Sequence, residues 1–96
     1  MALFDTEHYG KIISEQLADY LNKYTTASDR ANVSEATGVG VTTLRNIVYR
    51  TNNLTENNSI GVLELMRTAI ANAKQEKSNA INAVKYFSKQ VEKEAV

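Results

Sequence analysis

Two neighbouring residues near the middle of the chain, Arg45 and Asn46, carry side chains that can form paired hydrogen bonds with a planar ligand. Arginine can make a bidentate contact with guanine, and asparagine can make one with adenine. When the surrounding segment is drawn as a helix, both residues stand opposite its apolar face. The chemistry that this pair offers is recognition through hydrogen bonds.

Residues for catalysis or metal binding are scarce. The chain has no cysteine and a single histidine, His8, which excludes thiolate sites and metal sites built from several histidines. The segment Gly38-Val39-Gly40 lacks the third glycine and the preceding strand of a phosphate-binding loop. We therefore expect no enzymatic activity, no cofactor and no bound metal.

The stretch RANVSEATGVGVTTLRNIVY, residues 30–49, meets the demands of a helix-turn-helix, in which two helices are joined by a tight turn. The first helix needs an apolar residue facing the core and a small residue where the helices cross. The turn needs a glycine, and the second helix needs apolar residues three apart on its inner face. These demands are met by Val33, Ser34, Gly38, Val39, Leu44 and Ile47.

The segment VSEATGVGVTTLRNIV resembles the DNA-binding motif of Lac-repressor-family and lambda-repressor-like regulators. The family pattern of valine, a small residue, three residues, glycine and valine is matched by Val33, Ser34, Gly38 and Val39. The similarity is specific over about twenty residues, extends loosely to Asn72, and does not cover the last 24 residues. This sequence has serine at the small position, where alanine is more common, and Gly40 where the family often has a serine cap.

The resemblance implies a sequence-specific transcriptional regulator, such as a repressor, that lays the helix after Gly38 in the major groove of double-stranded DNA. It implies that bases are read by Val41, Thr42, Arg45, Asn46 and Tyr49. It implies that phosphates are contacted by Thr26, Ser28, Arg30, Thr43, Arg50, Asn52 and Asn53. Contacts to phosphate set the register on the duplex, whereas contacts to bases carry the specificity.

The whole chain, residues 1–96, reads as one all-α domain of four or five helices, because it has no proline, only four glycines and many strong helix formers. We expect a first helix over 5–24, capped by Asp5, and a second over 27–36, with Thr26 and Asp29 forming a capping box. A third should run from about 40 to 50. The fourth should be capped within 57–59, and the polar loop before it should place Leu54 in the core.

The fourth helix is expected to bury Ile60, Leu63, Met66 and Ile70. The helical pattern continues over about 73–94, either as the same helix or as a second one that begins near Ser78.

An apolar stripe on the C-terminal extension offers a surface for homodimerisation, through Ile81, Val84, Phe87 and Val91. The alternative is that this stripe closes over the first helix of the same chain. Residues 70, 77, 84 and 91 fall seven apart but are Ile, Lys, Val and Val, which makes a poor coiled-coil seam. A two-fold dimer would suit a reader of successive major grooves.

The formal net charge is zero, which counts against strong general attraction to nucleic acid. Residues 25–55 carry three Arg against Asp29 and Glu35, so the surplus around the motif is small. Neutrality favours a second interpretation, a helical protein-interaction module or small phage adaptor that does not bind DNA. With no secretory signal and no long apolar run, we expect a soluble, cytoplasmic protein without membrane or small-molecule partners.

Overall fold

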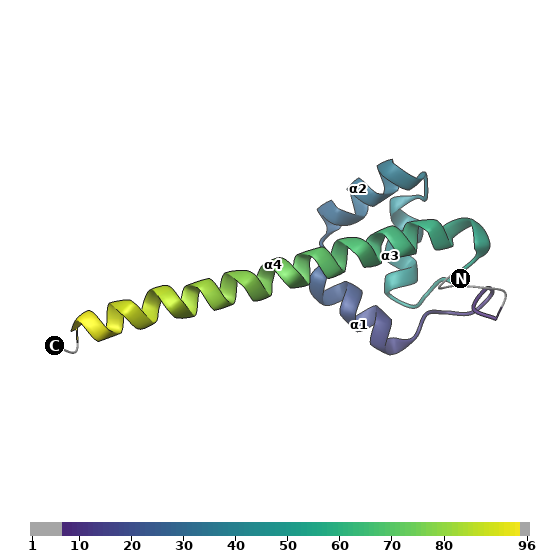
Figure 1. Ribbon diagram of the computed structural model, residues 1–96. Helices are drawn as coiled ribbons and strands as arrows, with labels where there is room; N and C mark the ends of the chain where they lie inside the picture. The colour runs from purple at the N-terminus through teal and green to yellow at the C-terminus, as the bar shows by residue number, and fades with distance from the viewer. Residues whose placement is uncertain (1–6, 95–96) are drawn as a thin grey trace.

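The computed structural model describes residues 7–94, which form four α-helices and no named strand. The first three helices gather around the N-terminal half of the last one (Figure 1). The bounds are α1 Glu15–Tyr24, α2 Ala27–Thr37, α3 Val41–Val48 and α4 Glu56–Glu94. The all-α class expected from the composition is confirmed, with four helices in the described part of the chain.

The first helix begins ten residues later than the sequence predicts. Ser14 is its N-cap, and the Ser14 hydroxyl accepts a hydrogen bond from the Leu17 backbone N–H at 3.1 Å. The preceding segment is held by an isolated antiparallel bridge between Lys11 and Leu54. A cap and a tertiary bridge therefore override the helical periodicity that runs back from Tyr24. The predicted cap, Asp5, lies outside the described residues.

The start of α4 is set by Thr55 and Asn58, and the predicted cap within 57–59 is wrong. The Asn58 backbone N–H donates to the Thr55 hydroxyl at 3.2 Å, and the Thr55 backbone N–H donates to the Asn58 side-chain oxygen at 2.7 Å. This reciprocal pair is a capping box with asparagine in the place of the usual acid. Just before it, Leu54 is buried with 2% of its surface exposed, as expected.

The buried face of α4 is turned relative to the predicted one. Val62, Leu65 and Ala69 are buried, whereas Ile60 and Ile70 are 56% and 43% exposed. Two apolar stripes overlap on this helix, and the packing of α1, α2 and α3 against it selects the stripe that contains Val62 and Leu65. The other two residues of the predicted stripe are half-buried at the edge of the core.

The hydrophobic core is built from residues of all four helices and of the loop before α4. The largest side chains with almost no exposed surface come from α1, α3, α4 and the loop before α4: Leu21, Leu44, Ile47, Leu54, Leu65, Val48 and Val62. The predicted stripe of α1 takes part, with Leu21 buried and Leu17, Tyr20 and Tyr24 partly buried against the cluster.

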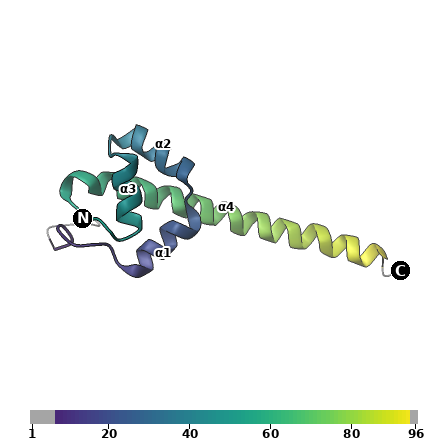
Figure 2. The ribbon, with the colours of Figure 1, turned by 180° about the vertical axis from the view of Figure 1, so that it is seen from behind.

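The last helix is continuous and does not break near Ser78. It runs beyond the other helices as a single rod, visible from both sides in Figures 1 and 2. The described structure is therefore elongated, with extents of 63 × 25 × 25 Å. A compact helical body, made of α1 to α3 and the first part of α4, thus carries a projecting helical arm.

Candidate nucleic-acid interface

The helix pair α2 and α3 is joined by a turn of three residues, Gly38 to Gly40. Gly38 has φ = 79° and ψ = 0°, the left-handed conformation that glycine adopts without steric cost. Its backbone N–H donates to the Ser34 carbonyl at 2.8 Å, which closes the end of α2. The sequence predicts a glycine in the turn at this position, and the structure confirms that Gly38 ends α2 and begins the turn.

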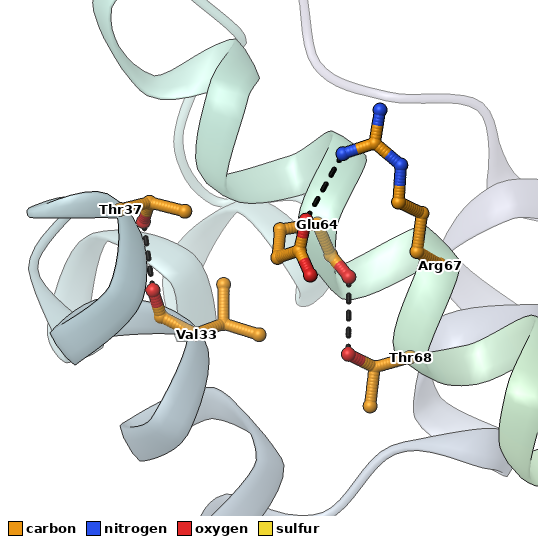
Figure 3. Close-up of polar contacts among 5 residues, drawn as sticks. All are labelled: Val33, Thr37, Glu64, Arg67 and Thr68. Carbon is orange, nitrogen blue, oxygen red and sulfur yellow. Dashed lines mark hydrogen bonds and ion pairs between the residues drawn. The ribbon is translucent and has the colours of Figure 1, made fainter.

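Thr37, which the sequence analysis did not single out, organises the same turn. Its hydroxyl donates to the Val33 carbonyl at 2.8 Å and accepts from the Val39 backbone N–H at 3.3 Å. Figure 3 shows the first of these bonds, with the Val33 side chain directed toward the part of α4 that carries Glu64 and Thr68. One hydroxyl therefore links the end of α2 to the residue that leads into α3.

A glycine inside α4 seats the beginning of α3. A Cβ added at Gly61 would lie 2.9 Å from Cβ and Cγ2 of Val39 and 2.9 Å from Cδ2 of Leu44. The approach of the turn and α3 to α4 therefore depends on the missing side chain. Sequence reasoning passed over Gly61 because a single glycine in a helical pattern does not reveal what approaches it.

The helix α3 has two contrasting faces. Leu44, Ile47 and Val48 are buried in the core, with at most 1% of their surface exposed. The side of α3 turned away from the core carries three exposed residues of the predicted base-reading set, Val41, Thr42 and Arg45, and a fourth, Tyr49, is exposed at the C-cap of the helix. The Arg45 guanidinium carbon lies 5.9 Å from the centre of the Tyr49 ring, at the outer range of a cation–π contact.

Asn46, the fifth predicted base-reading residue, is half-buried. Its backbone carbonyl accepts hydrogen bonds from the Thr51 backbone N–H at 2.9 Å and from the Thr51 hydroxyl at 3.2 Å. These bonds fix the exit from α3. The Asn46 side chain is thus less accessible than Arg45, its neighbour in the sequence.

Three of the predicted phosphate-contacting residues lie at the start of α2. The Thr26 hydroxyl accepts from the Asp29 backbone N–H at 3.2 Å, and the Asp29 carboxylate accepts from the Thr26 backbone N–H at 2.9 Å. The predicted capping box is confirmed, and in it the Thr26 hydroxyl serves as an acceptor. Ser28 is exposed, and Arg30 is half-buried, with its Nε atom buried and unpartnered among the described residues.

The other predicted phosphate-contacting residues are spread over α3 and the loop that follows it. Thr43 is half-buried on α3, whereas Arg50, Asn52 and Asn53 are exposed. Arg50 is the one described non-glycine residue with a positive φ, 61°, and its Nε donates to the Ile13 carbonyl at 2.9 Å. Arg50 therefore fastens the segment before α1 to the end of α3, a structural role that its sequence position did not reveal.

The apolar stripe predicted for dimerisation lies on the projecting arm. Ile81, Val84, Phe87 and Val91 are 47–67% exposed. They do not close over α1, so the intramolecular alternative is wrong. The end of the body is marked by Asn72, whose Nδ2 donates to the Tyr24 carbonyl at 2.8 Å and to the Asp29 carboxylate at 3.2 Å.

No family model, no curated protein and no solved structure matches this chain. Within residues 7–94, none of the helices is long and apolar enough to cross a membrane. The same part of the chain contains no group of three or more His, Cys, Asp or Glu side chains that could hold a metal ion. The helix pair and the arm are the features from which a function can be argued.

Proposed function

We propose that this chain is a sequence-specific DNA-binding regulator that places α3 in the major groove of double-stranded DNA. One observation carries the proposal. The helix α3 buries Leu44, Ile47 and Val48 almost completely, while its opposite face presents Thr42 and Arg45 to solvent, and the C-cap residue Tyr49 adds an exposed aromatic ring. The major groove admits an α-helix, and bases are distinguished there by the donors and acceptors on their edges.

The exposed residues of α3 have the chemistry for this task. Arg45 can pair with the O6 and N7 atoms of guanine, and each good bidentate pair gives about 1–3 kcal/mol of discrimination. Val41 and the Thr42 methyl group suit a thymine methyl group. Asn46 can pair with adenine if its half-buried side chain rotates outward. Ser28, Arg30 and Asn52 are placed near the ends of the helix pair, where phosphate contacts would set the register.

The arm supplies a surface for the second part of the proposal, a homodimer formed through Ile81, Val84, Phe87 and Val91. Contiguous exposed apolar side chains on a soluble protein often mark an interaction site. Two copies would double the number of base contacts, which matters for a chain of zero net charge.

The test is selection of duplex DNA from a random pool, followed by a comparison of Arg45→Ala with the matched control Arg67→Ala. Arg67 is an exposed arginine on α4 that pairs with Glu64 at 3.0 Å, so its loss removes the same charge outside the helix pair. We expect Arg45→Ala to weaken binding to the selected site by about five- to 150-fold, with little effect on random duplexes. Equal effects of the two substitutions would refute base reading by Arg45.

A protein-interaction module without DNA binding is the second candidate. Its support is the exposure of apolar surface at the two ends of α3, where Val41 is 43% and the C-cap residue Tyr49 is 51% exposed, together with the zero net charge. This candidate predicts that no duplex is enriched and that none is retained even at low salt, where phosphate contacts are strongest. Enrichment of any sequence would rule it out as the sole function.

A further inference from the structure

The arm of α4 beyond Asn72 is a helix that its own chain does not support. From Lys74 to Lys93 every side chain is exposed, including four of the large apolar residues Val84, Tyr86, Phe87 and Val91, at 59–67%. Most helical stability in proteins comes from packing of an apolar face. The arm has such a face, and its own chain leaves that face open to a partner surface.

Part of the apolar surface of the arm follows a heptad pattern, in which Lys77 is the one charged member and from which Ile81 and Tyr86 are absent. Intervals of three and four residues separate the members of one stripe: Ile70, Ala73, Lys77, Ala80, Val84, Phe87 and Val91. In coiled-coil notation the positions 70, 77, 84 and 91 are a, and 73, 80 and 87 are d. One long face of the arm is thus shaped to receive another helix.

A parallel pairing of two copies fits this stripe badly. In a parallel, in-register pair each core residue meets its own counterpart. Lys77 would then face a second Lys77, and the small residues Ala73 and Ala80 would face themselves while Phe87 faced a second Phe87. Like charges in the seam and alternating thin and thick layers both oppose this arrangement.

We propose that a second copy of the chain packs on the arm in the antiparallel direction, so that a positions meet d positions. Val84 then lies opposite Ala80 of the second copy, and Val91 lies opposite its Ala73. These two layers each combine a small side chain with a larger one. Lys77 lies opposite Phe87 of the second copy, where its apolar stem covers the ring and its ammonium group can make a cation–π contact.

The length of the arm agrees with this register. The body ends at Asn72, which is bonded to α1 and α2, and the pairing brings residue 73 of one copy to residue 91 of the other. The free length of each arm is therefore covered by the other arm, and the last residues of each helix, 92–94, lie beside the exposed residues 70–72 of the other copy. A parallel pair would instead bring both bodies to the same end.

The inference deepens the homodimer proposed above and does not depend on DNA binding. The centre of the antiparallel pair lies at residue 82, and α3 is seated on α4 at Gly61. Along the arms, the two copies of α3 are therefore separated by about 63 Å, at 1.5 Å per residue. Gly61 lies about 140° around the helix axis from Val84, at 100° per residue. A two-fold axis perpendicular to the arms then puts both copies of α3 on the same side of the dimer.

The test uses the full chain, which has no cysteine, so that one introduced cysteine can carry a spin label. The label is placed at Lys93→Cys, and the distance between labels is measured by pulsed electron resonance without DNA. The antiparallel register predicts about 33 Å along the axis at 1.5 Å per residue. A parallel pair predicts labels side by side, with helix axes about 8–10 Å apart.

Two further substitutions in the labelled protein separate the outcomes. Val84→Glu should abolish the distance of about 33 Å by placing a carboxylate in the seam. Asn82→Glu, on the opposite side of the arm, should leave that distance unchanged. A short distance would overturn the antiparallel direction and leave homodimerisation standing. A monomer at every concentration in sedimentation would overturn both, and neither result would bear on DNA binding.

Discussion

Replacement of Gly61 by alanine is expected to destabilise the protein, although alanine is the better helix former. Gly61 lies inside α4, and in an exposed helix interior the exchange would stabilise by about 1 kcal/mol. Gly61 is buried, however, and it lies against the turn, so that the exchange is expected to lower the free energy of unfolding instead of raising it.

The opposing cost comes from three contacts at 2.9 Å. The added Cβ would meet Cδ2 of Leu44, which can rotate away, and Cβ and Cγ2 of Val39. The Val39 Cβ atom moves only with its backbone, which belongs to the turn fixed by the left-handed Gly38. Overpacking of this kind costs about 1–3 kcal/mol, so a central value leaves a net loss of about 1 kcal/mol after the propensity gain.

The assay is urea unfolding followed by circular dichroism at one fixed protein concentration, because association would make stability depend on concentration. In a thermal scan of the same protein, a loss of 1 kcal/mol corresponds to a fall in Tm of about 4–8 °C for a domain of this size. The control is Ala71→Gly, at an exposed position of the same helix, which should lose about 1 kcal/mol through propensity alone. If Gly61→Ala instead stabilised the protein, the close seating of the turn on α4 would be refuted.

Three further outcomes are expected. Gly38→Ala should lower the free energy of unfolding by about 1–2 kcal/mol in the same assay, because a φ of 79° disfavours side chains even though no atom lies within 4 Å of the added Cβ. Gly38→Asn should lower it less, because asparagine adopts this conformation more readily. Thr26→Ala should cost about 1 kcal/mol by removing the capping box, while Thr26→Ser retains it; equal losses would contradict the cap. Selected duplexes should carry half-sites two helical turns apart, about 20 base pairs, whereas a separation of one turn would contradict the antiparallel dimer.

The parts of the fold that sequence patterns predicted correctly are set by neighbouring residues. The Thr26–Asp29 box, the left-handed Gly38 and the buried face of α3 each depend on contacts within a few positions along the chain. Leu54 was also predicted correctly, because one apolar residue in a polar loop has few places other than the core. The exposed face of α3 follows from its buried face by helical geometry alone.

The errors arose where tertiary contacts choose between local options. The periodicity of α1 extends back past Ser14, but the pairing of Lys11 with Leu54 holds that segment extended. On α4 two apolar stripes compete, and the close approach of α3 at Gly61 decides between them. The bond from Arg50 Nε to the Ile13 carbonyl, which joins residues 37 positions apart, was likewise not foreseen, and phosphate contact by Arg50 stays a prediction. None of these contacts leaves a periodic trace in the sequence.

The zero net charge and the projecting arm bear on each other. The logarithm of the DNA-binding constant falls linearly with the logarithm of the salt concentration, with a slope of about −0.9 per phosphate neutralised. A copy that offered three arginines would contribute a slope of roughly −2.7. Contacts that few give weak binding to DNA of any sequence. A dimer roughly doubles both the phosphate contacts and the base contacts, because its second recognition helix is already tethered beside the duplex. On the proposal that this neutral chain reads DNA through α3, the exposed seam of α4 is therefore the feature that would bring affinity into a useful range.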